Sequence, residues 1–379
     1  DLKQEAADKG KDYTAKKFEK AIKRGRATQA EADAVLARIT ATTDYAALKD
    51  VQLVVEAVFE DRGIKAKVTK MLEEVLPKDA VIASNTSALP INDLAENCQR
   101  PENFIGMHFF SPVERMPLVE VICGQKGNDA ALAKALDLCQ LMGKTPIVVN
   151  DGPGFFTTRF IGAYISETMA MLMQGVSPAL LENAAKVVGL PIGPLSVSDE
   201  IGLDVAHHAA EQQKKDLGAK FKPNAASDVV ATLVEKHGRH GRKNGKGFFD
   251  YDAEGNKTLW SGLNEIWPQK PQNQQPSAKE VQARMLYPQL VDAAKCVEEG
   301  VLTSPIDGDL GGILGVGFPP YTGGPFSMMD AIGIASVVKE MDRLEAAYGE
   351  QFKAPQLLRD MAKKDQTFYG SKAIDLSKK

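Results

Sequence analysis

Short apolar runs alternate with amphipathic stretches along residues 1–150. Runs of the type expected for buried strands lie at 51–59 (VQLVVEAVF), 80–83, 104–110, 118–122 and 145–149. Residues 62–76, 91–98 and 130–142 have helical spacing, and one face of the first of these collects Ile64, Val68, Met71, Leu72 and Val75. This strand–helix–strand order predicts a mostly parallel, doubly wound α/β sheet covered by helices.

The pattern becomes helical after the turn at 151–154 (DGPG). A long amphipathic helix is predicted over 159–175, with a core face formed by Ile161, Ile165, Met169, Leu172 and Met173. Further helices are predicted up to GKGFFDY at 245–251. A Pro-, Gln- and Asn-rich stretch at 267–277 is typical of a linker, and the helical pattern returns after it.

The second helical segment repeats the first. Arg159, the glycines at 175, 189 and 193, and Asp199 match in order Arg284, the glycines at 300, 317 and 324, and Asp330. This indicates an internal duplication of one helical domain. The predicted organisation is an incomplete dinucleotide-binding domain at 1–150, a helical substrate and dimerisation-type domain at 151–252, a linker at 253–277 and a second helical domain at 278–379.

The first residues contain no glycine-rich turn. A doubly wound dinucleotide-binding domain opens with a strand, a GxGxxG turn and a helix, and an acidic residue about 20 positions later binds the ribose. Asp1 stands before a basic helical stretch, where that acidic residue is expected. We therefore expect the first strand and glycine loop to be missing. Because that loop supplies N–H groups to the pyrophosphate, we expect this chain to be inactive alone.

The composition argues against several classes of protein. The 379 residues are 44% hydrophobic, and the formal net charge of -4 gives no overall reason to expect nucleic-acid binding. No apolar run is long enough to span a membrane. The four cysteines form no CxxC pair, and we interpret them as buried thiols in a reducing compartment. The histidines at 207, 208, 237 and 240 are interpreted as structural or surface groups, so no metal site is expected.

Three polar residues lie where chemistry is expected. His108 comes at the end of an apolar strand, where open α/β sheets bind ligands. Glu120 lies within the apolar run LVEVI, where a carboxylate is costly unless it is paired. Ser87 is in the polar turn after the preceding strand. A carboxylate that orients a histidine base suits alcohol oxidation, although a structural histidine in a loop is the alternative interpretation.

Several motifs, taken in order, resemble the 3-hydroxyacyl-CoA dehydrogenase family. They are VVEAVFE at 54–60, SNTS at 84–87, HFFSP at 108–112, LVE at 118–120 and PGF at 153–155. The segment GRKNGKGFF at 241–249 is similar to the family's end-of-domain signature. The second helical copy, with GFPP at 317–320, resembles the multifunctional fatty-acid oxidation α subunits. The resemblance covers nearly the whole chain and implies a Rossmann-type sheet followed by two duplicated all-α dehydrogenase C-terminal domains.

This resemblance implies NAD-dependent oxidation of (S)-3-hydroxyacyl-CoA in fatty-acid β-oxidation. It implies that His108 is the catalytic base, that Glu120 is its partner and that Ser87 hydrogen-bonds the substrate's 3-oxygen. Thr158 stands where many relatives have an asparagine that contacts the substrate carbonyl, and a threonine hydroxyl is shorter than an amide. The sequence TTR at 157–159 is similar to that of the trifunctional α subunits.

The resemblance also implies an NAD site. Ser111 stands where the family often has asparagine beside the nicotinamide, and Lys243 would approach the cofactor from the helical domain. The residues implied to line the cofactor are Asp1, Val58, Phe59, Glu60, Lys65, Ser87, Ser111 and Lys243.

A basic stretch near the start of the chain allows two interpretations. Lys16 and Lys17 could contact the phosphates of CoA, together with Lys20 and Lys23 on the same helix. The alternative is a solvated helix face.

Other functions and partners remain open at this point. A β-hydroxyacid dehydrogenase with a lysine base is disfavoured by the His108–Glu120 pair. A catalytically silent scaffold, or a fragment that binds a partner, is the non-enzymatic alternative. The expected partners are an acyl-CoA substrate, a fused enoyl-CoA hydratase domain and a thiolase subunit. The expected location is the bacterial cytoplasm, with the mitochondrial matrix as the alternative.

Overall fold

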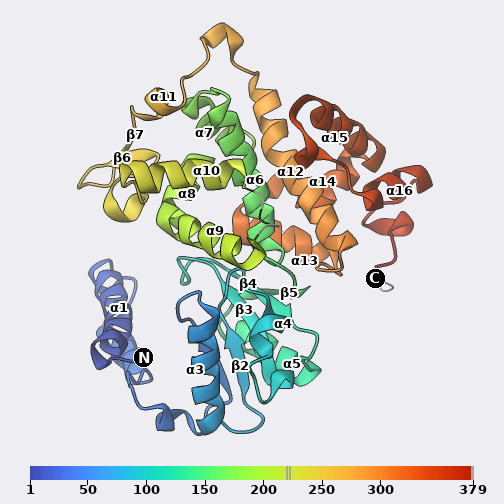
Figure 1. Cartoon of the computed structure of the whole chain (residues 1–379). Coiled ribbons are helices and arrows are strands. Elements are labelled where there is room, and N and C mark those ends of the chain that lie inside the picture. The colour runs from blue at the N-terminus through green and yellow to red at the C-terminus, as the bar shows by residue number, and fades with distance from the viewer. Residues whose placement is uncertain (219–220, 222, 377–379) are drawn as a thin grey trace.

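The chain folds into an α/β lobe and a helical lobe (Figure 1). The computed structural model describes residues 1–218, 221 and 223–376. Among these residues, no helix is long and apolar enough to cross a membrane. The predicted α/β sheet followed by helical domains is confirmed.

The sheet of the α/β lobe has five strands in the order of the chain. They are β1 (Leu53–Glu56), β2 (Val81–Ser84), β3 (Phe104–Phe109), β4 (Leu118–Cys123) and β5 (Thr145–Asn150). All neighbouring strands are parallel except β3 and β4, which are antiparallel. Every residue of β2 is buried, as expected for a strand covered on both faces. The helices around this sheet are α3 (Arg62–Val75), α4 (Ile91–Ala95) and α5 (Asp129–Leu141).

Two helices precede the sheet. They are α1 (Gln4–Lys23) and α2 (Gln29–Leu36), and a 3-10 turn at Tyr45–Leu48 leads into β1. Helix α1 has no buried residue and stands to one side of the sheet (Figure 1). Thr28 caps α2, with its side chain accepting from the backbone N–H of Glu31.

The buried face of α3 is rotated from the one expected. Ile64 is 41% exposed, whereas Lys65 is buried together with Val68, Thr69 and Leu72. The expectation for Ile64 was therefore wrong. Hydrophobic spacing predicts no lysine in the core, but the buried carboxylate of Glu56 at the end of β1 supplies the charge that Lys65 needs.

The helical lobe contains two copies of one arrangement. The first copy has α6 (Thr157–Met173), α7 (Pro178–Val187), α8 (Pro194–Ile201), α9 (Leu203–Leu217), α10 (Ala225–Ala231) and the hairpin β6 (Phe249–Tyr251) and β7 (Lys257–Leu259). A short helix, α11 (Leu263–Ile266), lies in the connection. The second copy has α12 (Ala278–Glu298), α13 (Pro305–Leu310), α14 (Pro325–Ile332), α15 (Ile334–Tyr348) and α16 (Gln356–Lys364).

Helix α6 starts one half-turn earlier than expected and is buried on more than one side. It contacts both α10 and α12, so Phe160, Tyr164 and Met171 are buried in addition to Met169 and Leu172. Met173 is 46% exposed, and its expected place on the core face was wrong. A helix between two neighbours buries a broad surface, which a single apolar stripe does not describe.

Two equivalent ion pairs join the two copies. Arg284 of α12 donates from Nε to Glu167 of α6 over 2.6 Å, and Arg159 of α6 donates from Nη2 to Asp292 of α12 over 3.1 Å. Arg159 and Arg284 occupy matching positions in the duplicated sequence. The contact is therefore isologous, of the kind found between two subunits related by a two-fold axis.

A second repeated feature anchors the end of each copy. An aspartate in the third helix accepts two backbone N–H groups from an aromatic pair downstream: Asp199 from Phe248 and Phe249, and Asp330 from Phe368 and Tyr369. Burial raises the pKa of Asp199 to about 6, and the two N–H bonds act against that rise.

All four cysteines are free thiols. Cys139 and Cys296 are buried, but Cys98 and Cys123 are only partly buried, so the expectation of four buried thiols was half wrong.

Candidate active site

His108 and Glu120 are direct cross-strand partners. They lie opposite each other on the antiparallel strands β3 and β4, so both side chains point to the same face of the sheet. Nδ1 of His108 is 3.0 Å from Oε2 of Glu120. Glu120 is fully buried and His108 is 7% exposed. The structure thus brings together the two residues on which the expected chemistry depends.

The contact determines which nitrogen of His108 is free. A carboxylate only accepts hydrogen bonds, so Nδ1 carries the hydrogen and donates it to Glu120. Nε2 is left as the atom that can accept a proton. The ring of Phe110 lies 4.5 Å from the imidazole, centroid to centroid, and limits its rotation. The pair has the form of a base held by an orienting carboxylate.

The first turn of α6 binds the carboxylate of Glu120. The backbone N–H groups of Phe156 and Thr157 donate to Oε1 over 2.9 and 3.1 Å. The hydroxyl of Thr157 donates to Oε2 over 2.5 Å. Such bonds at the positive end of a helix replace the water that a buried carboxylate loses.

An unusual turn aims these groups at Glu120. Gly154 and Phe155 adopt φ values of 74° and 49° immediately before α6. A left-handed conformation costs a non-glycine residue about 1–2 kcal/mol. The side chain of Phe155 is fully buried, and its packing offsets this cost.

Ser87 lies in the loop after β2, and hydrogen bonds to its backbone N–H and carbonyl fix its position. Its N–H donates to Oε1 of Glu60 over 3.0 Å, and its carbonyl accepts from Oγ1 of Thr158 over 2.9 Å. Asn85 in the same loop accepts from the N–H of Phe109, the residue after His108. The predicted substrate residue Thr158 therefore gives its single hydroxyl proton to Ser87, and its oxygen can serve another group only as an acceptor.

A buried ionic cluster lies at the carboxyl end of β1. Lys65 is 2% exposed and places Nζ 3.0 Å from Glu56 and 3.5 Å from Glu60. Glu56 also accepts from the hydroxyl of Ser84, and Val58 donates its N–H to the same carboxylate over 3.2 Å. Lys65 therefore supports the loop that carries Glu60.

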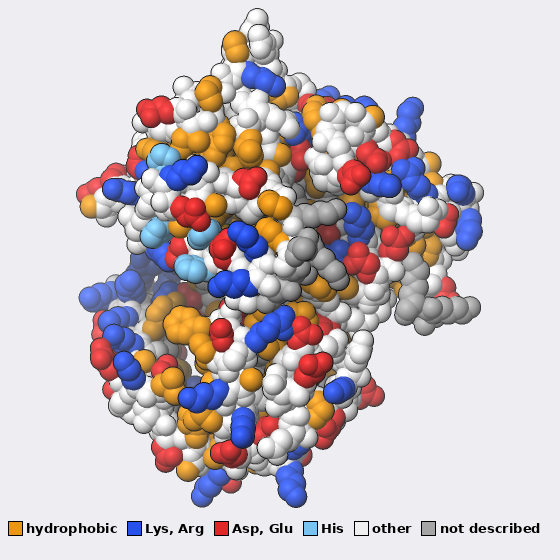
Figure 2. All heavy atoms as spheres, viewed as in Figure 1, with side chains coloured by type: hydrophobic (Ala, Val, Ile, Leu, Met, Phe, Trp, Pro, Cys, Tyr) orange, Lys and Arg blue, Asp and Glu red, His pale blue; other side chains and the backbone are white. Residues whose placement is uncertain are grey.

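Phe59 lies beside this cluster with 83% of its side chain exposed. An apolar ring left exposed at the carboxyl end of a parallel strand offers a surface for a planar ligand. Figure 2 shows a hollow between the two lobes, with histidine side chains on the helical side and apolar side chains on the α/β side.

Several other predicted residues lie on the surface. Lys16 is exposed, and Lys17 forms an ion pair with Glu114 in the loop after β3. Hydrogen bonds to Glu114 and Tyr13 raise the pKa of Lys17. This contact joins α1 to the loop after β3, the strand that carries His108.

The remaining predicted residues take no part in the hydrogen bonds of the His108–Glu120 pair. Ser111 is exposed in the loop after β3. Lys243 pairs with Asp204 at the start of α9. Asp1 is exposed, and its amino group donates to the carbonyl of Thr42 over 3.0 Å. Their roles toward a cofactor stay predictions.

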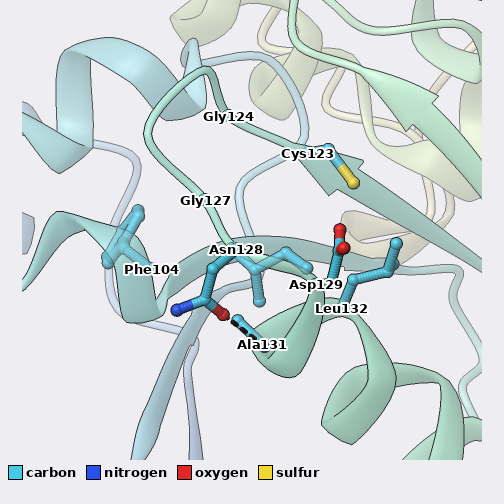
Figure 3. A pocket seen from close by; sticks show the side chains of 9 residues that line it. Phe104, Cys123, Gly124, Gly127, Asn128, Asp129, Ala131 and Leu132 are labelled. Carbon is cyan, nitrogen blue, oxygen red and sulfur yellow. Dashed lines mark hydrogen bonds between the residues drawn. The ribbon is translucent and has the colours of Figure 1, made fainter.

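A small pocket lies at the other end of β3 and β4. Its cavity of about 90 Å³ is lined by residues that include Phe104, Cys123, Asn128 and Leu132, and Figure 3 shows Asn128 turned to cap α5. It is too small for an acyl-CoA and is lined by no residue of the predicted site. Among the described residues, no group of three His, Cys, Asp or Glu side chains could hold a metal ion.

One residue of the site was not expected from the sequence. Thr157 is 1% exposed and contacts Glu120 with both its N–H and its hydroxyl. The resemblance drew attention to residue 158, which is next to it. A threonine at the first position of a helix, three residues after Gly154, is the signal that points to residue 157.

Taken together, a doubly wound sheet, a histidine–carboxylate pair at the carboxyl end of β3 and duplicated helical domains define a two-lobed dehydrogenase. The model of the 3-hydroxyacyl-CoA dehydrogenase NAD binding domain matches residues 1–152. The model of the 3-hydroxyacyl-CoA dehydrogenase C-terminal domain matches residues 154–251 and 281–373. The chain belongs to the 3-hydroxyacyl-CoA dehydrogenase family.

Curated relatives extend beyond this chain. The fatty acid oxidation complex subunit alpha of Shewanella baltica (strain OS185) is 40% identical over 359 residues, which are 94% of this chain and 50% of that protein. The protein of the same description from Shewanella oneidensis is 38% identical over 374 residues, which are 97% of this chain and 52% of that protein. The chain thus spans about half the length of these relatives.

Solved structures share the fold. The crystal structure of 3-hydroxybutyryl-CoA dehydrogenase from Escherichia coli K12 has a TM-score of 0.78 at 24% identity, covering 96% of this chain and 92% of that one. The (S)-3-hydroxybutyryl-CoA dehydrogenase from Ralstonia eutropha has a TM-score of 0.61 at 35% identity, covering 66% of this chain and 89% of that one.

Proposed function

We propose that this chain carries the NAD-dependent oxidation of (S)-3-hydroxyacyl-CoA to 3-oxoacyl-CoA in fatty-acid β-oxidation. The observation that carries the proposal is the 3.0 Å contact between Nδ1 of His108 and Oε2 of Glu120, because it presents Nε2 as a base. Family membership and the relatives' description as fatty acid oxidation subunits support the choice of substrate.

In the proposed mechanism, Nε2 of His108 takes the proton of the C3 hydroxyl. Glu120 stabilises the imidazolium that forms and keeps the ring in one tautomer. Ser87, held between Glu60 and Thr158, hydrogen-bonds the developing 3-keto oxygen. The chemistry that bound NAD supplies is the acceptance of hydride from C3.

The residues present fit an NAD molecule at the carboxyl ends of β1 and β2. The exposed ring of Phe59 offers an apolar contact, and Glu60 offers a carboxylate whose other bonds are already arranged by Ser87 and Lys65. Val58, Phe59, Glu60 and Ser87 are the residues that we propose to hold the nicotinamide and its ribose.

The relatives suggest that this chain is part of a longer protein. They are described as α subunits of a fatty acid oxidation complex and are about twice as long as this chain. We propose that the complete protein has an enoyl-CoA hydratase domain and assembles with a thiolase. A bacterial cytoplasmic location is part of the proposal, since the four thiols are free and the relatives are bacterial.

The test is a turnover assay of the complete protein. NADH formation is followed at constant NAD with (S)-3-hydroxyacyl-CoA and, in parallel, with free 3-hydroxyacids. We expect turnover of the CoA thioesters and its near-complete loss in the His108→Gln variant. Turnover of free hydroxyacids alone would favour a different hydroxyacid dehydrogenase, and no turnover of either class would favour a silent scaffold.

A further inference from the structure

The carboxylate of Glu120 has two neighbours on the same oxygen. Oε2 lies 3.0 Å from Nδ1 of His108 and accepts the hydroxyl proton of Thr157 over 2.5 Å. Oγ1 of Thr157 is itself 3.5 Å from Nδ1 of His108. The hydroxyl therefore lies at the contact between the base and its partner.

Thr157 is the first residue of α6, so no carbonyl of that helix lies four residues before it, and its hydroxyl is available to a partner outside the helix. A threonine inside a helix commonly donates to the carbonyl four residues earlier. Thr168 of the same helix does so, with its hydroxyl 2.9 Å from the carbonyl of Tyr164. Thr157 instead donates to a carboxylate 37 positions away in the sequence, although both threonines are buried.

We propose that Thr157 is a positioning residue of the His108–Glu120 pair and sets the pH range over which the pair works. The proposal rests on the dehydrogenase function proposed above. By donating to Oε2, Thr157 partly offsets the negative charge on the oxygen that faces His108. Without this hydroxyl, the bare oxygen attracts the protonated imidazole more strongly, and the ring keeps its proton to a higher pH.

Other titratable groups of the described residues lie near the pair. Cys296 of α12 interacts electrostatically with Glu120, and burial raises the pKa of its thiol, so it stays neutral. Beyond it, Arg159 is ion-paired with Asp292 and also with Glu299. Glu60 faces the neighbouring loop and accepts from Ser87. None of these groups contacts the oxygen that Thr157 and His108 share.

The decisive variant is Thr157→Val in the complete protein, because valine keeps the shape and removes only the hydroxyl. kcat/KM for 3-hydroxyacyl-CoA oxidation is measured from acid to alkaline pH. We expect the acid limb of the profile to move about 0.5–1 pH unit upward, as for loss of one charge-assisted hydrogen bond. We also expect kcat to fall about 10-fold at neutral pH, with KM changed by less than about 3-fold.

Two matched variants separate positioning from packing. Thr157→Ser keeps the hydroxyl, and we expect it to restore the wild-type pH profile. Thr168→Val makes the same change in the same helix, removes a hydrogen bond to a carbonyl, and is expected to leave the profile unmoved. A profile that moves equally in Thr157→Val and Thr168→Val contradicts the proposal.

A second measurement does not depend on turnover. The titration of the His108 ring is followed by NMR with labelled histidine, and the signal is assigned by its absence in His108→Gln. We expect the titration midpoint to move upward in Thr157→Val and to return in Thr157→Ser. An unmoved midpoint overturns the role of Thr157. Absent turnover with a moved midpoint overturns the proposed reaction and leaves the coupling of Thr157 to His108 intact.

Discussion

Arg284 donates to Glu167 across the contact between the two helical copies, and both side chains are almost fully buried. Nε lies 2.6 Å from Oε1, and the side chains are 3% and 2% exposed. The equivalent pair, Arg159 with Asp292, is 18% and 17% exposed. The two ion pairs thus occupy equivalent positions in the duplicated sequence but differ in burial. We therefore expect their removal to change the free energy of unfolding by different amounts.

Breaking the buried pair is expected to destabilise the helical lobe strongly. In Arg284→Met, Glu167 keeps the 2.9 Å bond from Gln351 but loses its cationic partner, so its charge is buried without compensation. We expect a loss of about 3–5 kcal/mol in the free energy of unfolding, measured by urea denaturation of the complete protein. Arg159→Met is the matched control and is expected to cost less, because its partners Asp292 and Glu299 are 17% and 50% exposed and stay in contact with water.

The double variant Arg284→Met/Glu167→Leu distinguishes charge from packing. An apolar pair of similar volume removes both charges, so we expect most of the lost stability to return. If the double variant is as unstable as Arg284→Met alone, the loss comes from packing and not from the unpaired charge.

His108→Gln tests the base directly. Glutamine has similar size but accepts no proton at neutral pH, so we expect kcat to fall by about 10²–10⁴-fold while KM stays within a few-fold. Steady-state kinetics of the complete protein measure both constants. Near-normal kcat in this variant would falsify the assignment of His108.

Glu120→Gln tests the partner. An amide can donate to Nδ1 of His108, which favours the tautomer whose Nε2 carries hydrogen and cannot accept the substrate proton. We expect kcat to fall by about 10²–10⁴-fold with little change in KM. Glu120→Asp keeps the charge but shortens the side chain, and we expect a smaller loss. Equal kcat in all three proteins would exclude an orienting role.

The sequence indicated the strands and their polar residues because strand patterns are local. Glu120 stands out as a carboxylate within LVEVI, and its antiparallel pairing with the strand of His108 explains why the two meet. The resemblance named Lys65 as a cofactor residue, but its burial was not expected, because that burial depends on Glu56 in another element. The periodicity of one helix does not show a partner that lies on a neighbouring strand, even when the two residues are only 9 positions apart in the sequence.

The partners of Thr157 and Thr158 at the start of α6 were likewise not evident from the sequence. Both hydroxyls contact the α/β lobe, Thr157 at Glu120 and Thr158 at Ser87. Adjacent residues on a helix point in directions about 100° apart, so the sequence cannot tell which strand or loop each one reaches. Only the docking of α6 on β4 decides this, and it depends on the whole core.

The contact of Lys17 with Glu114 leads to the last prediction. If Lys17 binds a phosphate of CoA, it must leave Glu114, which now holds it by an exposed ion pair. We therefore expect Lys17→Ala to raise KM for acyl-CoA about 3- to 10-fold and Glu114→Gln to lower it, since a freed lysine needs no exchange of partners. The matched substrate is an acyl-pantetheine, which lacks the nucleotide phosphates of CoA and whose KM is expected to be equal in wild type and Lys17→Ala. Equal effects of Lys17→Ala on both substrates contradict phosphate binding and leave Lys17 as a link between α1 and the loop after β3.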